Sequence, residues 1–111
     1  MVTSKEILDE LTANIKSIFN DSLLKIILYG SRVRNDGTEE SDIDFVVLTD
    51  LEDDIIREKE RDVTNISVEL SLKYDSVVSV LIINYDIYKK YLNVLPFYKN
   101  IETEGIEVYG R

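Results

Sequence analysis

The sequence predicts an α/β fold in which one small mixed sheet is flanked by helices. Two long segments, residues 4–19 and 52–74, repeat apolar residues at helical spacing. No internal repeat and no Pro/Gly/Ser-rich linker divides the 111 residues, so we expect a single domain over residues 1–111. Three short apolar runs have the composition of buried strands, at residues 24–29, 43–49 and 77–83.

The first predicted element is a helix from Ser4 to Phe19. Thr3 and Glu6 have the spacing of a capping box, in which Thr3 is the N-cap. Residues 20–22 are turn formers and should end the helix. The helix should bury one apolar stripe, which contains Ile7, Leu8, Leu11, Ile15, Ile18 and Phe19.

Two strands should follow, separated by a loop. The runs 24–29 and 43–49 are continuously apolar rather than alternating, which is typical of strands buried on both faces. Residues 30–41 between them are polar and include two glycines, so we expect a loop there. Functional loops are commonly carried between rigid strands in this way.

The second half should contain an amphipathic helix, a strand and smaller elements. Residues 52–74 carry an apolar stripe on a charged helix. We expect Asp86 to cap a short helix, Pro96 to open the last helix and Gly105 to close it. Residues 106–109 alternate and should add an edge strand. The short helix is expected to contain Tyr88, Tyr91 and Leu92.

Composition excludes several kinds of site. The chain has neither cysteine nor histidine, which excludes disulfides, thiolate or imidazole metal ligands and a histidine base. Its net charge of −9 disfavours direct binding to nucleic acid. There is no signal-like apolar stretch at the start and no run long enough to span a membrane. We therefore expect a cytoplasmic protein whose chemistry depends on carboxylates, hydroxyls, cations or a bound metal.

Asp42 and Asp44 are the candidate metal ligands. Residues two apart on a strand face the same side, so their carboxylates would lie roughly 7 Å apart along the chain. Two like charges at this distance repel unless a cation lies between them, and Mg²⁺ prefers carboxylates, water and phosphate oxygens. Taken alone, an Asp-x-Asp pair is more often a turn or cap residue followed by an exposed strand residue.

The preceding loop offers candidate phosphate contacts. Gly30 at the end of a strand lets the backbone approach a ligand closely, and Ser31 adds an amide and a hydroxyl. The same pair is also compatible with a simple tight turn. Arg32 and Arg34 can clamp phosphate through the planar guanidinium group, or they can pair with acidic residues of the loop.

Together these residues resemble the signature of the minimal nucleotidyltransferases of the polymerase-beta-like superfamily, including the antitoxins of HEPN/MNT pairs. The signature is Gly-Ser, ten residues, then Asp-x-Asp leading into an apolar strand. The resemblance is strongest over residues 24–49 and extends more loosely over the whole chain. The resemblance implies transfer of a nucleoside monophosphate, most simply AMP from ATP, to a hydroxyl group. It also implies that Gly30 and Ser31 contact the triphosphate while Asp42 and Asp44 are catalytic ligands of Mg²⁺ or Mn²⁺.

The chain departs from this family pattern at one position. The resemblance implies a third carboxylate on the next strand, here residues 77–83, and that strand contains no acid. Ser79 occupies the position where the carboxylate is expected. Asp75 has the same parity but precedes Ser79 by about 13 Å at the strand rise, which makes it a poor substitute.

Two functions therefore remain open. In the first, the chain is an enzyme that modifies a tyrosine of a helical HEPN-type partner, as the resemblance implies. In the second, it is a non-catalytic antitoxin or interaction module whose nucleotide site is weakened. A group of tyrosines in the C-terminal third is compatible with core packing and with an exposed partner surface. These tyrosines are Tyr85, Tyr88, Tyr91, Tyr98 and Tyr109.

Overall fold

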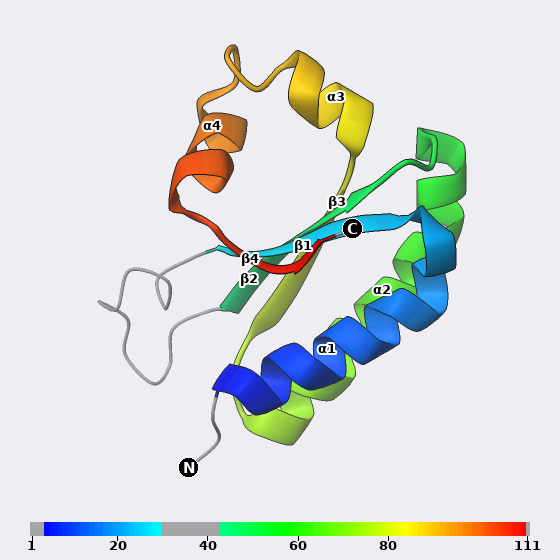
Figure 1. The fold of residues 1–111 in the computed structure, drawn as a ribbon. Helices are drawn as coiled ribbons and strands as arrows, with labels where there is room; N and C mark the ends of the chain where they lie inside the picture. The colour runs from blue at the N-terminus through cyan, green and yellow to red at the C-terminus, as the bar shows by residue number, and fades with distance from the viewer. Residues whose placement is uncertain (1–3, 30–42, 111) are drawn as a thin grey trace.

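The computed structural model describes residues 4–29 and 43–110 of the chain, and their arrangement confirms the predicted α/β fold (Figure 1). The elements in chain order are helix α1 (Ser4–Phe19), the 3-10 turn η1 (Asn20–Ser22), strand β1 (Leu23–Tyr29), strand β2 (Ile43–Thr49), helix α2 (Asp53–Tyr74), strand β3 (Val78–Asn84), helix α3 (Tyr85–Lys90), helix α4 (Pro96–Glu104) and strand β4 (Ile106–Gly110).

The four strands form one mixed sheet in the order β3-β2-β1-β4. Strand β1 pairs antiparallel with both β2 and β4, whereas β2 and β3 run parallel. Parallel neighbours need a crossover connection, and α2 supplies it between β2 and β3. The predicted tail strand is confirmed as an edge strand, and β3 forms the opposite edge.

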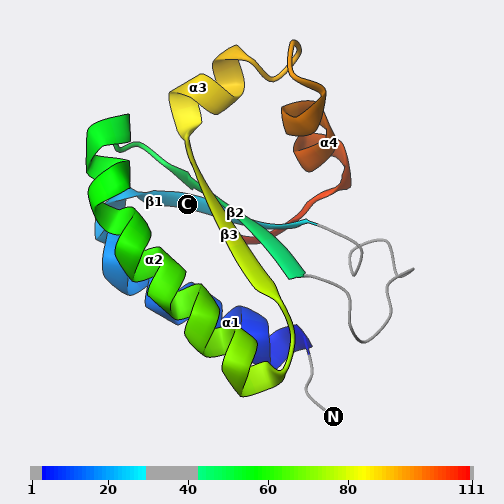
Figure 2. The same ribbon diagram turned by 180° about the vertical axis from the view of Figure 1, so that it is seen from behind.

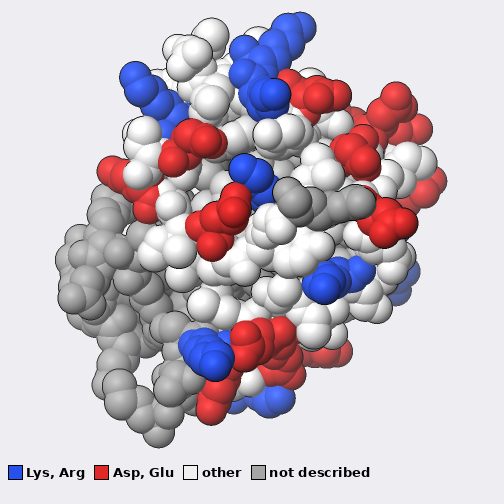
Figure 3. All heavy atoms as spheres, viewed as in Figure 1, with Lys and Arg blue, Asp and Glu red and all other residues white. Residues whose placement is uncertain are grey.

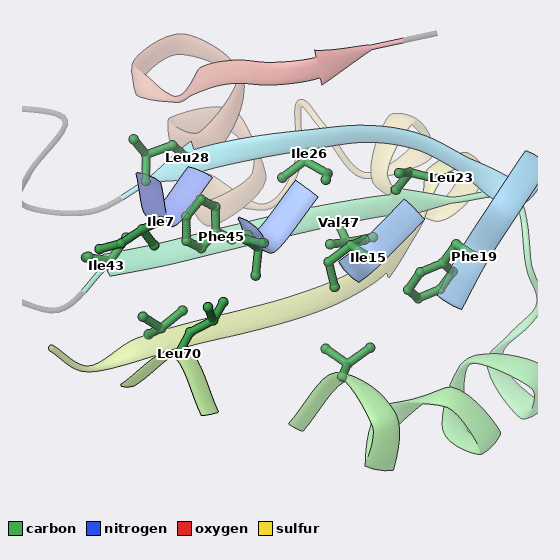
Figure 4. Packing of buried hydrophobic residues seen from close by; sticks show 13 residues of the cluster. Ile7, Ile15, Phe19, Leu23, Ile26, Leu28, Ile43, Phe45, Val47 and Leu70 are labelled. Atoms are coloured by element: carbon green, nitrogen blue, oxygen red, sulfur yellow. The ribbon is translucent and has the colours of Figure 1, made fainter. Parts of the chain in front are cut away.

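Helices α1 and α2 cover one face of the sheet (Figures 1 and 2). The apolar side chains of α1 recur every three or four residues and point at the strands, as Figure 4 shows for Ile7, Ile15 and Phe19. Fully burying each such side chain stabilises the fold by roughly 1.5–3 kcal/mol. This layer contains most of the buried core residues. The α2 stripe meets the same core through Val63 and Leu70.

Helices α3 and α4 cover the other face and enclose a smaller core (Figure 2). On β2, Val46 and Leu48 point into this second core, while their neighbours point toward α1 and α2. Strand β2 is thus buried on both faces, as its continuous apolar run predicts. The second core consists of Ile27, Val46, Leu48, Ile83, Tyr88 and Ile101.

Most predicted boundaries are confirmed to within a residue, and α1 and β2 agree at both ends. The turn prediction at residues 20–22 is also confirmed, since Asn20 adopts a left-handed conformation with φ of 52°. Thr3 lies outside the described residues.

The predicted cap of the short helix is wrong. Asn84, not Asp86, caps α3, because its side-chain oxygen accepts a hydrogen bond from the amide of Ile87 at 3.0 Å. The helix begins directly at the end of β3, two residues earlier than a cap at Asp86 would place it. Tyr91 is consequently its C-cap, and Leu92 lies beyond it.

Gly105, between α4 and β4, provides a stability prediction. A Cβ atom at this position would overlap the Cγ2 of buried Ile27 and lie 2.6 Å from the backbone oxygen of Ile101. Gly105→Ala should therefore lower the free energy of unfolding by roughly 1–3 kcal/mol, measured by urea denaturation.

Gly110→Ala is the matched control for Gly105→Ala. The three atoms nearest to the added methyl all belong to the carboxyl end of Glu107, an exposed side chain on the same strand that can move aside while it stays near Lys25. We expect its denaturation midpoint to stay close to that of the unchanged chain. Equal loss in both variants would contradict the proposed overlap.

A pH-dependent contact joins α1 to the end of α2. The carboxylate of Glu10 accepts hydrogen bonds from the ammonium of Lys73 at 2.8 Å and from the hydroxyl of Tyr74 at 2.5 Å. These bonds, that of Lys73 foremost, lower the pKa of Glu10 below its ordinary value of 4.5. A lowered pKa means that the stabilisation is complete above about pH 4.5 and is lost as the pH falls through the folded-state value.

Glu10→Gln should therefore be less stable than the unchanged chain at pH 7, and the difference should shrink as the pH falls below 4.5. Thermal melts from pH 7 to pH 3 measure this difference. Glu58→Gln removes a carboxylate from the exposed face of α2 and is the matched control. A difference between the Glu10 variant and the unchanged chain that is independent of pH would refute the contribution of its charge.

Candidate functional site

Three residues form a row across one end of the sheet. Tyr29, the last residue of β1, pairs with Asp44 of β2, and Asp44 pairs with Ser79 of β3. Partners on neighbouring strands lie about 4.8 Å apart and point to the same face. The segment 30–42 leaves β1 and enters β2 at this end of the sheet.

Asp44 lies on the face covered by α3 and α4. The alternation of β2 puts it on the same side as Val46 and Leu48, which are buried in the second core. Asp44 itself is half-buried at the margin of that core. Strand β2 is buried on both faces, so it can hold the Asp44 carboxylate in a defined position at the edge of the apolar layer.

A chain of aromatic contacts connects this row to the helices above it. The ring of Tyr29 meets the ring of Phe97 edge-on, with centroids 6.0 Å apart. Phe97 neighbours Tyr98 at 6.2 Å, and Tyr98 neighbours Tyr88 at 5.2 Å. Edge-on and offset aromatic pairs of this kind are favourable, and here they fix the start of α4 beside the candidate site.

Tyr88 holds α3 and α4 together. Its ring is buried in the second core, and its hydroxyl donates a hydrogen bond to the carboxylate of Glu102 at 2.6 Å. Burial, with help from this hydrogen bond, raises the pKa of Tyr88, so the hydroxyl stays protonated and remains a donor. The two helices therefore form one unit over the sheet.

The row also shows where the expected third carboxylate would lie. Ser79 lies beside Asp44 and is exposed, so an acid at this position would face the same space as Asp44. Asp75 is the left-handed C-cap of α2, with φ of 50°, and it precedes β3. Among residues 4–29 and 43–110, no group of three or more acidic side chains converges on a possible metal site.

The other predicted site residues lie outside the described part of the chain. They are Gly30, Ser31, Arg32, Arg34 and Asp42. The structure adds two neighbours that the sequence reasoning missed, Tyr29 and Phe97. Tyr29 is recognisable only as the residue before Gly30, and Phe97 carries no local signal because a tertiary contact brings it to the site.

The donor chemistry of the chain fits a hard divalent cation. Without histidine or cysteine, its side chains offer mainly oxygen donors, which are the ligands of Mg²⁺ and Mn²⁺. Mg²⁺ needs only one or two protein carboxylates, since water and phosphate oxygens complete its shell. Asp44, at the start of β2, supplies one such carboxylate.

A separate hollow lies between α1 and β4, away from this row. It has one acidic and one basic residue among mostly apolar or small neighbours, and no set of polar groups converges in it. Its lining residues are Leu8, Asp9, Thr12, Ala13, Lys16 and Val108. Within the part of the chain that the structure describes, no helix has the length and apolar character needed to cross a membrane.

Comparison with known families finds one match that spans nearly the whole chain. A family model for the nucleotidyltransferase domain matches residues 6–108. Two proteins of Methanocaldococcus jannaschii, both provisionally named protein adenylyltransferases, are similar in sequence. One is 37% identical over 93% of this chain and 96% of its own length, and the other is 31% identical over 97% and 100%.

Solved structures with a similar fold come from toxin–antitoxin complexes. A chain in the structure of tri-AMPylated Shewanella oneidensis HEPN toxin with MNT antitoxin matches with a TM-score of 0.57 and 20% identity. This match covers 98% of our chain and 74% of the solved one. A chain in a toxin–antitoxin structure with AMP-PNP also has a TM-score of 0.57 and 20% identity, over 98% and 75%. These similarities support the fold.

Proposed function

Because this chain belongs to the nucleotidyltransferase domain family, we propose that it transfers AMP from ATP to a hydroxyl group of a protein. The observation that carries the proposal is the position of Asp44, which a rigid strand holds at the margin of an apolar layer beside segment 30–42. The protein adenylyltransferase names of relatives that align over almost the entire chain support AMP and a protein acceptor.

In this proposal, each residue of the signature has a distinct task. Asp42 and Asp44 would hold Mg²⁺, which when bound would neutralise charge on the triphosphate. Gly30 and Ser31 contact phosphate oxygens through backbone amides and the serine hydroxyl. Arg32 or Arg34 clamps a phosphate through its guanidinium group.

The reaction is a displacement at the α-phosphorus of ATP. The acceptor oxygen forms a bond to this phosphorus, and the bond to the bridging oxygen of the leaving pyrophosphate breaks. The acceptor loses its hydroxyl proton. Since Ser79 stands where the third carboxylate is expected, we propose that this proton passes to solvent or to a base on the acceptor protein.

We propose a helical HEPN-type protein as the acceptor, modified on a tyrosine. The support is the structural similarity to a complex in which the HEPN toxin is tri-AMPylated. The chain would then act as an antitoxin, because attaching AMP places a bulky anion on its partner. Neutralisation and catalysis would be the same event.

The test is transfer of label from α-³²P-ATP to the purified protein encoded beside this chain, with Mg²⁺ or Mn²⁺. We expect label on the partner that is abolished by EDTA and by either Asp42→Ala or Asp44→Ala. Label from γ-³²P-ATP should not appear, since the γ-phosphate leaves with pyrophosphate. If the partner takes up the γ-label instead, the chain is a kinase and the proposal is wrong.

A second candidate is a binding module that neutralises its partner without transferring nucleotide. The absence of an acid at position 79, in register with Asp44, favours it. The two candidates differ in the behaviour of Asp44→Ala. Under the first, this variant no longer protects cells from the partner, whereas under the second it still binds the partner and protects.

A further inference from the structure

Exposed apolar side chains gather on the layer formed by α3 and α4. Buried groups hold these helices on the sheet, yet their outer side and the turn between them expose large apolar residues to a substantial degree. We call this the α3–α4 surface. Its apolar members are Ile87, Tyr91, Val94, Leu95 and Phe97, with exposed fractions between 37% and 69%.

The middle of the α3–α4 surface is basic, although the chain as a whole is acidic and the two helices also carry exposed acids at their outer ends, Asp86, Glu102 and Glu104. Residues 87–101 contain three lysines and no acid, within a chain of net charge −9. All three, Lys89, Lys90 and Lys99, are exposed. Figure 3 shows blue lysine atoms on either side of uncharged atoms at the upper end of the molecule, over α3 and α4.

These lysines are not neutralised within the described chain. The ion pairs found among residues 4–29 and 43–110 involve Lys25 with Glu107 and Lys73 with Glu10. The ammonium groups of Lys89 and Lys90 instead lie over tyrosine rings of the same region, at 5.5 Å from the ring centroids. Apolar centres with a positive rim therefore remain available to an external surface of opposite charge.

The α3–α4 surface is continuous with the candidate site. Phe97, one of its members, contacts Tyr29, which pairs directly with Asp44. One ring contact thus joins the surface to Tyr29, and one strand spacing of about 4.8 Å separates Tyr29 from Asp44. A protein bound to this surface would reach the place where a nucleotide's α-phosphate must lie for transfer.

We propose that the α3–α4 surface docks the acceptor protein, through an apolar patch of that protein rimmed by carboxylates. The proposal rests on the proposed function for the statement that the docked protein is the acceptor. The apolar residues would supply affinity, and the lysines would supply orientation and speed of association. Specificity for the acceptor would then come from this layer rather than from the nucleotide loop.

A second copy of this chain and a nucleic acid fit the α3–α4 surface less well. A symmetric dimer through it would bring the three lysines of one copy against those of the other, because a twofold interface apposes the same patch. A nucleic acid would be attracted by only three lysines and repelled by the rest of a chain of net charge −9. An acidic, partly apolar protein surface would match both the exposed apolar residues and the lysines.

The first test places a charge at the centre of the apolar members. Val94→Asp should weaken the complex with the purified neighbour-encoded protein by at least about tenfold, measured by calorimetry. Leu72→Asp is the matched control, because Leu72 is even more exposed, at 79% against 69%, and lies on α2. It should leave the affinity unchanged.

The second test reverses the rim charges. The double variant Lys89→Glu/Lys90→Glu should weaken the complex by about tenfold at low salt, and less at high salt, because salt screens the interaction. Arg57→Glu/Arg61→Glu, on the exposed side of α2, is the charge-matched control. In the transfer assay, the lysine variant should raise KM for the acceptor while its affinity for ATP stays unchanged.

These measurements separate the docking surface from the proposed activity. Complex formation requires no transfer, so a docking effect with no label transfer would retain the surface and reject the enzyme. Transfer that survives Val94→Asp with unchanged KM would overturn the docking surface and leave the enzyme intact. The same variants are also tested for self-association in sedimentation and for binding to a labelled single-stranded RNA. If either property is lost while the acceptor complex is unchanged, the proposed docking of the acceptor is wrong.

Discussion

Replacing Asp44 by asparagine is expected to lower the rate of AMP transfer by about a thousandfold, or ~4 kcal/mol of transition-state stabilisation. Asparagine keeps the shape of the side chain at the start of β2 but removes the charge that would hold the cation. The loss should therefore appear in kcat, and raising the Mg²⁺ concentration should restore part of it.

Asp50→Asn is the matched control for Asp44→Asn. Asp50 is exposed and follows directly after the opposite end of β2. Its substitution therefore removes one charge close to the same strand without changing the row of Tyr29 and Asp44. We expect full activity from it. Thermal melts of both variants should show that the fold is retained, and normal transfer by Asp44→Asn would remove this residue from the site.

The second large expected effect is a gain of activity. Ser79→Asp should raise the rate of transfer by roughly a hundredfold when the acceptor is a tyrosine peptide that has no base of its own, because a positioned general base contributes roughly 10²–10⁴. Ser79 is exposed and in register with Asp44, so the new carboxylate would face the same space. Ser79→Asn has the same shape without the base and should show no gain.

The same variant has a readout that does not depend on activity. Two carboxylates on neighbouring strands, about 4.8 Å apart, repel each other when no cation is present. Ser79→Asp should therefore melt at a lower temperature than Ser79→Asn in EDTA, and added Mg²⁺ should restore it by binding the folded state. Identical melting of the two variants in EDTA and in Mg²⁺ would show that positions 44 and 79 do not share a cation.

Some features of this protein could be predicted because they depend on neighbouring residues. The apolar spacing of α1 and the continuous apolar run of β2 specify element type and length, and the structure agrees with both at each end. Pro96 acts through its own backbone properties, so the start of α4 could also be predicted. Gly105 ends the helix as predicted, but its backbone is extended with φ of −72°, and it is the close approach of Ile27 that leaves no room for a Cβ. The N-cap of α3 was missed because Asn84 ends a strand and starts a helix, two roles that the local pattern does not separate.

What the sequence by itself determined was the set of elements, the mixed α/β class and the signature from Gly30 to Asp44, because these follow from local spacing and residue chemistry. Only the tertiary structure decided that Ser79 lies beside Asp44, that Phe97 contacts Tyr29, and that the lysines of α3 and α4 form the rim of an apolar surface. Asp44 and Ser79, like Tyr29 and Phe97, are far apart in the chain. Strand order and helix packing bring them together, and neither can be predicted from the local spacing of residues.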